Sequence, residues 1–139
     1  MFLETILSDA LHPTEPNRTP VSAFTGRWKN RRGSVMELTV HNDHHIHGTF
    51  HTQVEEHGSP FHLSGFAEGD ALSFSVDFGH RGSVASWSGH HMIDDRGEHL
   101  VTLWHVARPV RDPHGVAELS GAILSGSDEF TRVEDPATP

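Results

Sequence analysis

Several common features are missing from this chain of 139 residues. It has no cysteine, which excludes disulfides, iron–sulfur clusters and cysteine-type zinc sites. Lysine and arginine number 10 against 19 aspartates and glutamates, and the resulting net charge of −9 argues against a general nucleic-acid-binding role. No apolar run approaches the roughly 20 residues that a membrane-spanning helix needs. We therefore expect neither nucleic acid nor a membrane among its partners.

The two ends of the chain differ from its middle. Phe2, Leu3, Ile6 and Leu7 can form one face of a short helix, which the prolines before residue 21 would stop. We expect residues 1–20 to be a flexible N-terminal arm and not a secretory signal, because the segment lacks a basic start. Residues 135–139 are predicted to be a disordered tail, which leaves 21–134 as one domain. The sequence leaves the localisation open.

Between the ends, apolar and polar residues alternate with period two. Met36, Leu38 and Val40, for example, alternate with Glu37 and Thr39. The strands expected on this basis are 24–29, 35–40, 45–51, 61–67, 71–78, 83–92, 99–107, 117–124 and 129–133. About eight strands at such short spacing predict an all-β fold, either an eight-stranded antiparallel up-and-down β-barrel or a sandwich.

A barrel of about eight strands holds either one small ligand or a plug of side chains. The residues expected to face inward include tryptophan, serine and asparagine besides aliphatic residues. Burying such polar groups costs free energy unless they form hydrogen bonds. The pattern therefore favours a small-molecule pocket.

Six short segments carry a more specific signal. They are F-T-G-R-W-K-N-R-R-G-S (24–34), G-T-F (48–50), L-S-G-F (63–66), S-W-S-G (86–89), V-T-L-W (101–104) and L-S-G-S-D-E-F-T-R-V (124–133). Taken in order, they resemble strands of the avidin/streptavidin family of biotin-binding proteins, over about residues 24–134. The resemblance implies a non-enzymatic barrel that holds biotin or a close analogue as a ligand, with no catalytic cofactor.

The resemblance also implies which polar residues would contact the ligand. Asn30, Ser34 and Phe50 match positions that bind the carbonyl oxygen of biotin's ureido group, although Phe50 lacks the hydroxyl of the family's tyrosine. Thr52 and Asp128 match positions that accept the ureido N–H groups. An ionised Asp128 would give a charge-assisted hydrogen bond.

The rest of the implied site is apolar or lies at the pocket entrance. Phe78, Trp87 and Trp104 match the aromatic walls around the ring system of biotin. Ser83 matches a position at or beside the valerate carboxylate, and Val54 matches a contact in the lid loop.

Three positions depart from the family pattern. Ala85 falls where the family often has a threonine against the ring sulfur, and Arg32 replaces a frequent leucine. Near Ser120, tetrameric members carry a tryptophan that closes the pocket of a neighbouring subunit, whereas this chain has no tryptophan after Trp104. The resemblance therefore implies a divergent homo-oligomer, with a dimer somewhat favoured over a tetramer.

Two other functions stay open. The same barrel with a drifted pocket could bind another small ligand, or bind biotin only weakly, as Phe50, Ala85 and Arg32 suggest. A small β-barrel enzyme with a histidine base is the other alternative, but the sequence offers no nucleophile–base motif.

The 14 histidines need a separate interpretation. If Met36 and its neighbours point inward, then His41, His45, His47 and His51 point outward, and His41 and His45 flank one turn. Imidazoles gathered on one face can bind Zn²⁺ or Ni²⁺. Glu37 lies on the same face, but no nearby carboxylate is an obvious catalytic partner. We expect no metal site there, and whether these histidines sense pH is open.

Overall fold

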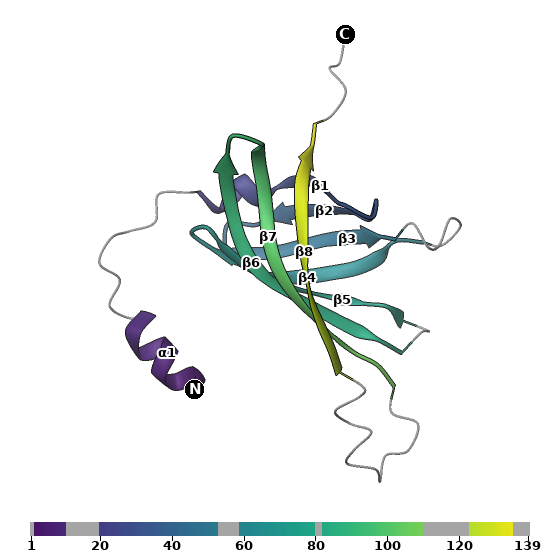
Figure 1. The fold of residues 1–139 in the computed structure, drawn as a ribbon, viewed down its shortest axis with the longest axis horizontal. Coiled ribbons are helices and arrows are strands. Elements are labelled where there is room, and N and C mark those ends of the chain that lie inside the picture. Colours follow the sequence, from purple (N-terminus) through teal and green to yellow (C-terminus); the bar gives the residue numbers. More distant parts are fainter. Residues whose placement is uncertain (1, 11–19, 53–58, 80–81, 110–122, 135–139) are drawn as a thin grey trace.

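The computed structural model describes residues 2–10, 20–52, 59–79, 82–109 and 123–134. Within these residues, eight strands pair with their neighbours in chain order, and the last pairs with the first, so the sheet closes into a barrel (Figure 1). All pairings are antiparallel. The strands are β1 (Gly26–Asn30), β2 (Val35–Val40), β3 (His45–His51), β4 (Phe61–Glu68), β5 (Ala71–Asp77), β6 (Val84–Asp94), β7 (Gly97–Ala107) and β8 (Ile123–Val133). The predicted up-and-down barrel is confirmed.

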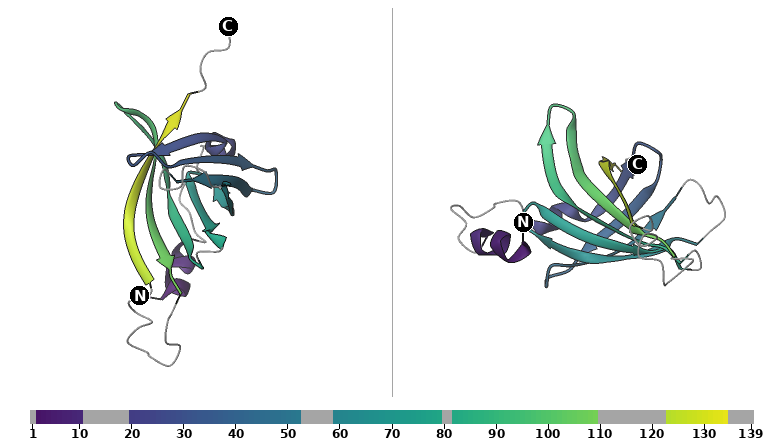
Figure 2. Two further views of the ribbon diagram at one scale, coloured as in Figure 1. Left: turned by 90° about the vertical axis from the view of Figure 1, so that its right-hand side faces the viewer. Right: turned by 60° about the horizontal axis from the view of Figure 1, so that its bottom comes forward.

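The strands differ in length around the barrel. β6, β7 and β8 have 11 residues each, whereas β1 has 5 and β4 has 8. The β6–β7 hairpin consequently extends beyond the shorter strands, as the two turned views in Figure 2 show.

Three of the expected strands are corrected by the structure. The strand expected at 24–29 begins only at Gly26, because Val21–Phe24 forms a 3-10 helix, η1, whose Phe24 is buried. The separate strands expected at 117–124 and 129–133 are replaced by the single strand β8, and residues 117–122 lie outside the described part. Gly126 and Asp128 resemble turn residues in sequence, but both lie within β8, paired with β7.

The N-terminal segment contains a short helix, α1 (Leu3–Ala10). Leu3, Ile6 and Leu7 in α1, and Phe2 just before it, are exposed to solvent. The predicted helical face therefore forms, while the flexible arm over residues 1–20 stays a prediction.

In the described part of the chain, none of the helices has the length and apolar character needed to cross a membrane.

The alternation seen in the sequence places one face of each strand in the barrel interior. On β2, Met36 and Leu38 are buried while Glu37 and Thr39 are exposed. Burying each large apolar side chain contributes about 1.5–3 kcal/mol. The buried apolar residues are Phe24, Trp28, Met36, Leu38, Ile46, Phe50, Leu63, Ala67, Leu72, Phe74, Val76, Ala85, Trp87, Leu100 and Phe130.

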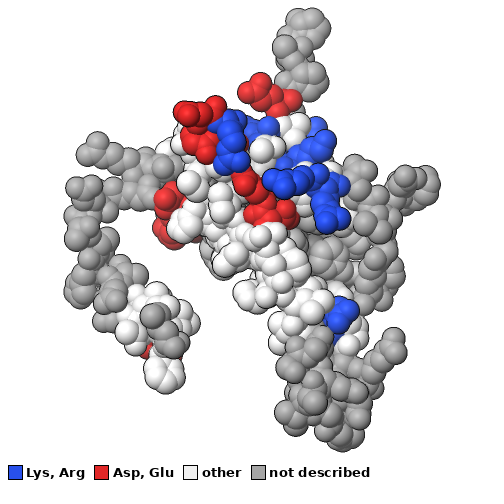
Figure 3. All heavy atoms as spheres, in the orientation of Figure 1, with Lys and Arg blue, Asp and Glu red and all other residues white. Residues whose placement is uncertain are grey.

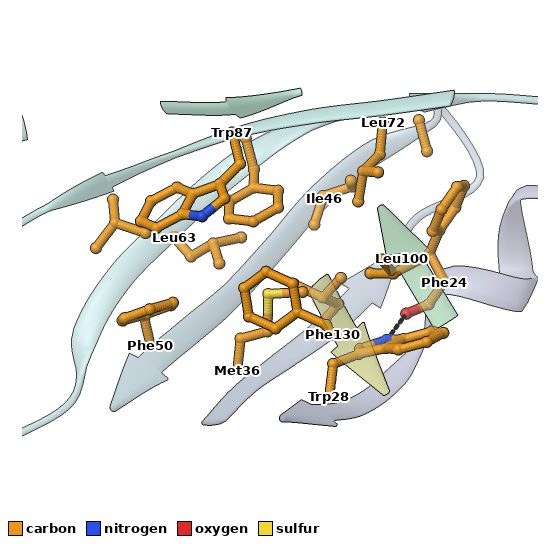
Figure 4. Packing of buried hydrophobic residues seen from close by; sticks show 14 of the residues in the cluster. Phe24, Trp28, Met36, Ile46, Phe50, Leu63, Leu72, Trp87, Leu100 and Phe130 are labelled. Carbon is orange, nitrogen blue, oxygen red and sulfur yellow. Dashed lines mark hydrogen bonds between the residues drawn. The ribbon is translucent and has the colours of Figure 1, made fainter. Parts of the chain in front are cut away.

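One end of the barrel, which we call the base, is packed around the buried Trp28. The indole Nε1 of Trp28 donates a hydrogen bond to the carbonyl oxygen of Phe24 at 2.9 Å (Figure 4). Arg132 lies over the indole ring, with Cζ 4.2 Å from its centre. The same guanidinium donates to both carboxylate oxygens of Glu98, at 2.7 and 2.8 Å, and to the carbonyl oxygen of Thr25 at 2.9 Å. These contacts fasten η1 and β8 to the base of the barrel.

The Glu98–Arg132 pair should make stability depend on pH in acid. Hydrogen bonds from Arg132 lower the pKa of Glu98 from an ordinary 4.5 to about 2, against the opposing effect of burial. Because the folded-state pKa lies below the unfolded one, the contribution is present above pH 5 and is lost as the pH falls towards 2. One pKa unit corresponds to about 1.4 kcal/mol, so this contribution is at most about 3–4 kcal/mol.

We expect Glu98→Gln to lower stability at pH 7 and to flatten the stability profile between about pH 5 and pH 2. Urea unfolding at a series of pH values measures this. Glu68→Gln is the matched control, because the side chain of Glu68 is 76% exposed. Among the described residues, Glu68 forms an ion pair with His44 alone. Equal profiles for the two variants would contradict the role of Glu98.

Candidate ligand-binding site

The antiparallel order gathers the predicted site residues at one end of the barrel. β1, β3, β5 and β7 end there, and β2, β4, β6 and β8 begin there; we call this end the mouth. Val54 lies outside the described residues. The others are placed as follows: Asn30 ends β1, Ser34 precedes β2, Phe50 and Thr52 lie at the end of β3, Phe78 follows β5, Ser83 precedes β6, Ala85 and Trp87 lie in β6, Trp104 in β7 and Asp128 in β8.

A hydrogen-bonded pair forms the polar part of the site. Asn30 Nδ2 donates to Asp128 Oδ2 at 3.0 Å, across the seam where β1 meets β8. Asn30 Oδ1 accepts from the backbone N–H groups of Arg32 and Ser34, at 3.1 and 2.9 Å. Asp128 Oδ1 accepts from the backbone N–H of Glu129 at 3.0 Å. Both side chains are therefore held in place before any ligand arrives.

The pair keeps hydrogen-bonding capacity for a ligand. An amide nitrogen carries two hydrogens, and Asn30 uses one of them on Asp128. Each carboxylate oxygen has two lone pairs, and the bonds above use one on each oxygen. A donor and an acceptor thus lie side by side, which matches a ligand group with a carbonyl oxygen next to an N–H.

Thr102 supports this pair and was missed by sequence reasoning. It is 1% exposed, and its hydroxyl donates to the backbone carbonyl oxygen of Asp128 at 2.9 Å. Thr102 lies opposite Asp128 in the β7–β8 register. The only signal in the sequence is its inward position in V-T-L-W (101–104), which alone does not identify a partner.

Aromatic rings line the interior below the mouth. The Trp87 indole stacks on Phe74, with ring centres 5.1 Å apart and planes at 12°, and it lies against Phe50 at 5.2 Å. The ring centre of Phe78 lies 6.2 Å from that of Phe50 and 4.9 Å from that of Phe61. The structure therefore joins three predicted residues, Phe50, Phe78 and Trp87, into one cluster and adds Phe61 and Phe74. Figure 4 shows Phe50 and Trp87 on facing sides of this interior.

Trp104 completes the aromatic walls from β7. It lies opposite Trp87 on β6 and opposite Gly126 on β8. A Cβ atom at Gly126 would come within 2.4 Å of the Trp104 ring, so only glycine leaves room for the indole in its present position.

The remaining predicted residues take simpler positions. Thr52 is half-buried after β3, and Ala85 is buried opposite Val76 on β5. Ser83 is also half-buried, and its carbonyl oxygen accepts a hydrogen bond from the Phe78 N–H at 3.0 Å. These two backbone atoms close the β5–β6 turn at the mouth.

A cavity of about 670 Å³ adjoins Asp128 and Thr102 on the outer side of the barrel wall. Its outward-facing lining comes from β6, β7 and β8, with Val101 and Leu103 among the apolar members, and Arg31 and Arg32 contribute from the β1–β2 turn. The cavity is therefore distinct from the aromatic cluster in the interior.

Three of the outward-facing histidines, His41, His45 and His47, gather near the β2–β3 turn at the opposite end. The ring of His47 lies 4.2 Å from that of His45 and 5.1 Å from that of His41, and His47 Nε2 is 3.0 Å from His45 Nδ1. Among the residues that the structure describes, no three His, Cys, Asp or Glu side chains are arranged to hold a metal ion.

The fold and the mouth together define a class: small up-and-down β-barrels with a polar pair and aromatic walls at one end. The sequence model of the avidin family matches residues 19–133. The chain belongs to the avidin family. A search of curated proteins finds no match.

Solved structures agree with this fold. The biotin-binding protein from chicken superimposes with a TM-score of 0.69 at 24% identity, covering 80% of this chain and 96% of that one. The rhizavidin–biotin complex gives a TM-score of 0.69 at 24% identity, covering 86% and 100%. Xenavidin gives a TM-score of 0.67 at 23% identity, covering 78% of this chain and 96% of that one. At these identities the comparison establishes the fold.

We expect Gly126→Ala to displace the Trp104 indole, because the added Cβ has no room. Overpacking of this kind costs about 1–3 kcal/mol. Thermal unfolding and near-ultraviolet circular dichroism measure the effect, with Ser125→Ala at the exposed neighbouring position as the control. Wild-type stability and an unchanged spectrum would contradict the close packing of Gly126 on Trp104.

Proposed function

We propose that this protein is a non-enzymatic binder of biotin or a close analogue, held at the mouth of the barrel. The observation that carries the proposal is the fixed Asn30–Asp128 pair. The ureido group of biotin has one carbonyl acceptor flanked by two N–H donors, and the pair presents a free N–H beside a carboxylate. Membership of the avidin family supports the same ligand.

Each predicted residue then has a role in the complex. Asn30 and Ser34 donate to the ureido oxygen, and Asp128 and Thr52 accept from the ureido N–H groups. An N–H bond to a carboxylate is charge-assisted and about twice as strong as a neutral one. The remaining contacts follow the family pattern: Phe78, Trp87 and Trp104 pack on the rings of biotin, with Phe50 and Ala85 beside them, and Val54 and Ser83 lie near the valerate chain.

The proposal predicts that removing either member of the polar pair weakens biotin binding. Leaving a buried ligand atom unpaired costs about 1–3 kcal/mol, so Asp128→Ala and Asn30→Ala should each raise the Kd roughly 5- to 150-fold. Titration calorimetry measures this. Asp95→Ala, in the β6–β7 turn at the other end of the barrel, should leave the Kd unchanged. If the native chain binds biotin and neither variant at the pair weakens it, the assignment of the site is wrong.

The second candidate function is the same barrel with a pocket that binds another small ligand, or binds biotin only weakly. Phe50 is the residue that favours it. Phe50 is 4% exposed and faces Trp87, so the hydroxyl that a tyrosine would offer is absent from the interior. If the site is a biotin site, Phe50→Tyr should tighten biotin about five-fold through one added hydrogen bond. Weaker binding by this variant would favour a different ligand.

We also propose that the barrels pair through the outer face of β7 and β8. Val101, Leu103 and Ile123 point outward there and are 41%, 63% and 57% exposed. In Figure 3, charged side chains gather towards one end of this face, and the middle of it shows uncharged atoms. A second copy would cover these apolar side chains. A dimer is favoured over a tetramer, because the family's inter-subunit tryptophan is absent.

The assembly can be tested by light scattering at micromolar concentration. We expect a dimer for the native chain and a monomer for Leu103→Glu, which places a charge in the interface. Ile93→Glu, at an exposed position near the β6–β7 turn, serves as the control and should stay dimeric. A native chain that is monomeric at this concentration would contradict the proposal.

A further inference from the structure

The two buried tryptophans of this barrel differ in how their indole N–H groups are bonded. Trp28 and Trp87 are both buried, with 0% and 6% of the residue exposed. Trp28 Nε1 donates to the Phe24 carbonyl oxygen at 2.9 Å. Among the described residues, Trp87 Nε1 is buried and has no hydrogen-bond partner. Figure 4 shows both nitrogens, and only that of Trp28 has a bond drawn to it.

Packing fixes the unpaired N–H in its orientation. The Trp87 ring lies flat on Phe74 and against Phe50, and its strand neighbours are Phe74 on β5 and Trp104 on β7. Rotating the indole to find an acceptor would break these ring contacts. An indole N–H is a donor only, and a buried donor without an acceptor is unfavourable. The side chain is therefore held in a state that an incoming acceptor would improve.

The position of Trp87 separates it from the polar pair. Asn30 and Asp128 lie on β1 and β8, whereas Trp87 lies on β6, with β7 between β6 and β8. Because the Trp87 indole packs on Phe74 and Phe50, an acceptor that reaches its N–H belongs to the part of the ligand that packs on these rings. Ala85, two residues earlier on the same inward face, has no polar side-chain atom to offer.

We propose that Trp87 Nε1 is a second polar contact of the site, which selects ligands with a hydrogen-bond acceptor in the ring portion that packs on the aromatic walls. This inference rests on the proposed function and deepens it. For biotin, the atom concerned is the ring sulfur, a weak acceptor. An analogue with a ring oxygen offers a stronger acceptor, and one with a ring methylene offers none.

The test removes the N–H and keeps the shape of the ring. Trp87 is replaced site-specifically by 3-benzothienylalanine, in which sulfur stands in place of the indole N–H. Titration calorimetry compares biotin, its ring-oxygen analogue and its ring-methylene analogue on the native chain and on this variant. The native chain should prefer the oxygen analogue over the methylene analogue by on the order of ten-fold. The variant should bind the two within two-fold. A preference that persists in the variant, or is absent from the native chain, overturns the proposal.

A second measurement needs no ligand and keeps the two proposals separable. In the ligand-free protein, the same replacement at Trp28 should lower the Tm by about 3–6 °C, because it removes the bond to Phe24. At Trp87 it should leave the Tm unchanged or raised, because no bond is lost. A fall at Trp87 equal to that at Trp28 would show that the N–H is already bonded within the protein, which overturns the inference. If the native chain binds none of the three compounds, the proposed biotin function fails, and the Tm comparison still decides whether Trp87 has a donor free for a ligand.

Discussion

The closure of the barrel between β1 and β8 is the constraint on which the mouth depends. Asn30 and Asp128 are 98 positions apart in the chain, and the β1–β8 ladder brings them within hydrogen-bond distance. The pair exists only if every strand between them keeps its register, because a slip of one residue would turn each inward side chain outward. The same ladder places Arg132 over Trp28, so the base and the mouth are set by one seam.

The two ends of the barrel use polar groups differently. At the base, Arg132 bonds to Glu98 and to backbone carbonyl oxygens, and Trp28 bonds to Phe24, so the donors there are met within the protein. At the mouth, Asn30 and Asp128 keep spare capacity, and Trp87 holds a donor without an acceptor among the described residues. The base contacts stabilise the fold, whereas the mouth keeps donor and acceptor atoms that have no partner among the described residues.

Much of the fold could be predicted from the sequence, because each strand has one face exposed to solvent and one face buried in the barrel. The segment 35–40 was predicted with the bounds that β2 has, since its alternation is strict and turn residues flank it. β8 was divided in error, because glycine and aspartate within a strand resemble a turn until the neighbouring strand is known. Gly126 lies there to admit Trp104, which is a tertiary reason that no local pattern contains.

The site was predictable only in part. The polar and aromatic positions came from a resemblance between short segments, and the structure gathers those it describes at one end of the barrel. Other contacts depend on the register between neighbouring strands, which the sequence does not show. They are the hydrogen bond between Asn30 and Asp128, the hydrogen bond from Thr102 to Asp128, and the stacking of Phe74 on Trp87. The unpaired indole N–H depends on side-chain packing, which sequence reasoning does not reach.

A crystal structure of the protein with biotin would test the central claim most directly. We predict that the ureido group lies within hydrogen-bond distance of Asn30 Nδ2 and of the Asp128 carboxylate, with the bond between these two side chains kept as it is without ligand. Biotin bound away from the mouth, or an Asn30–Asp128 bond broken to admit it, would contradict the account.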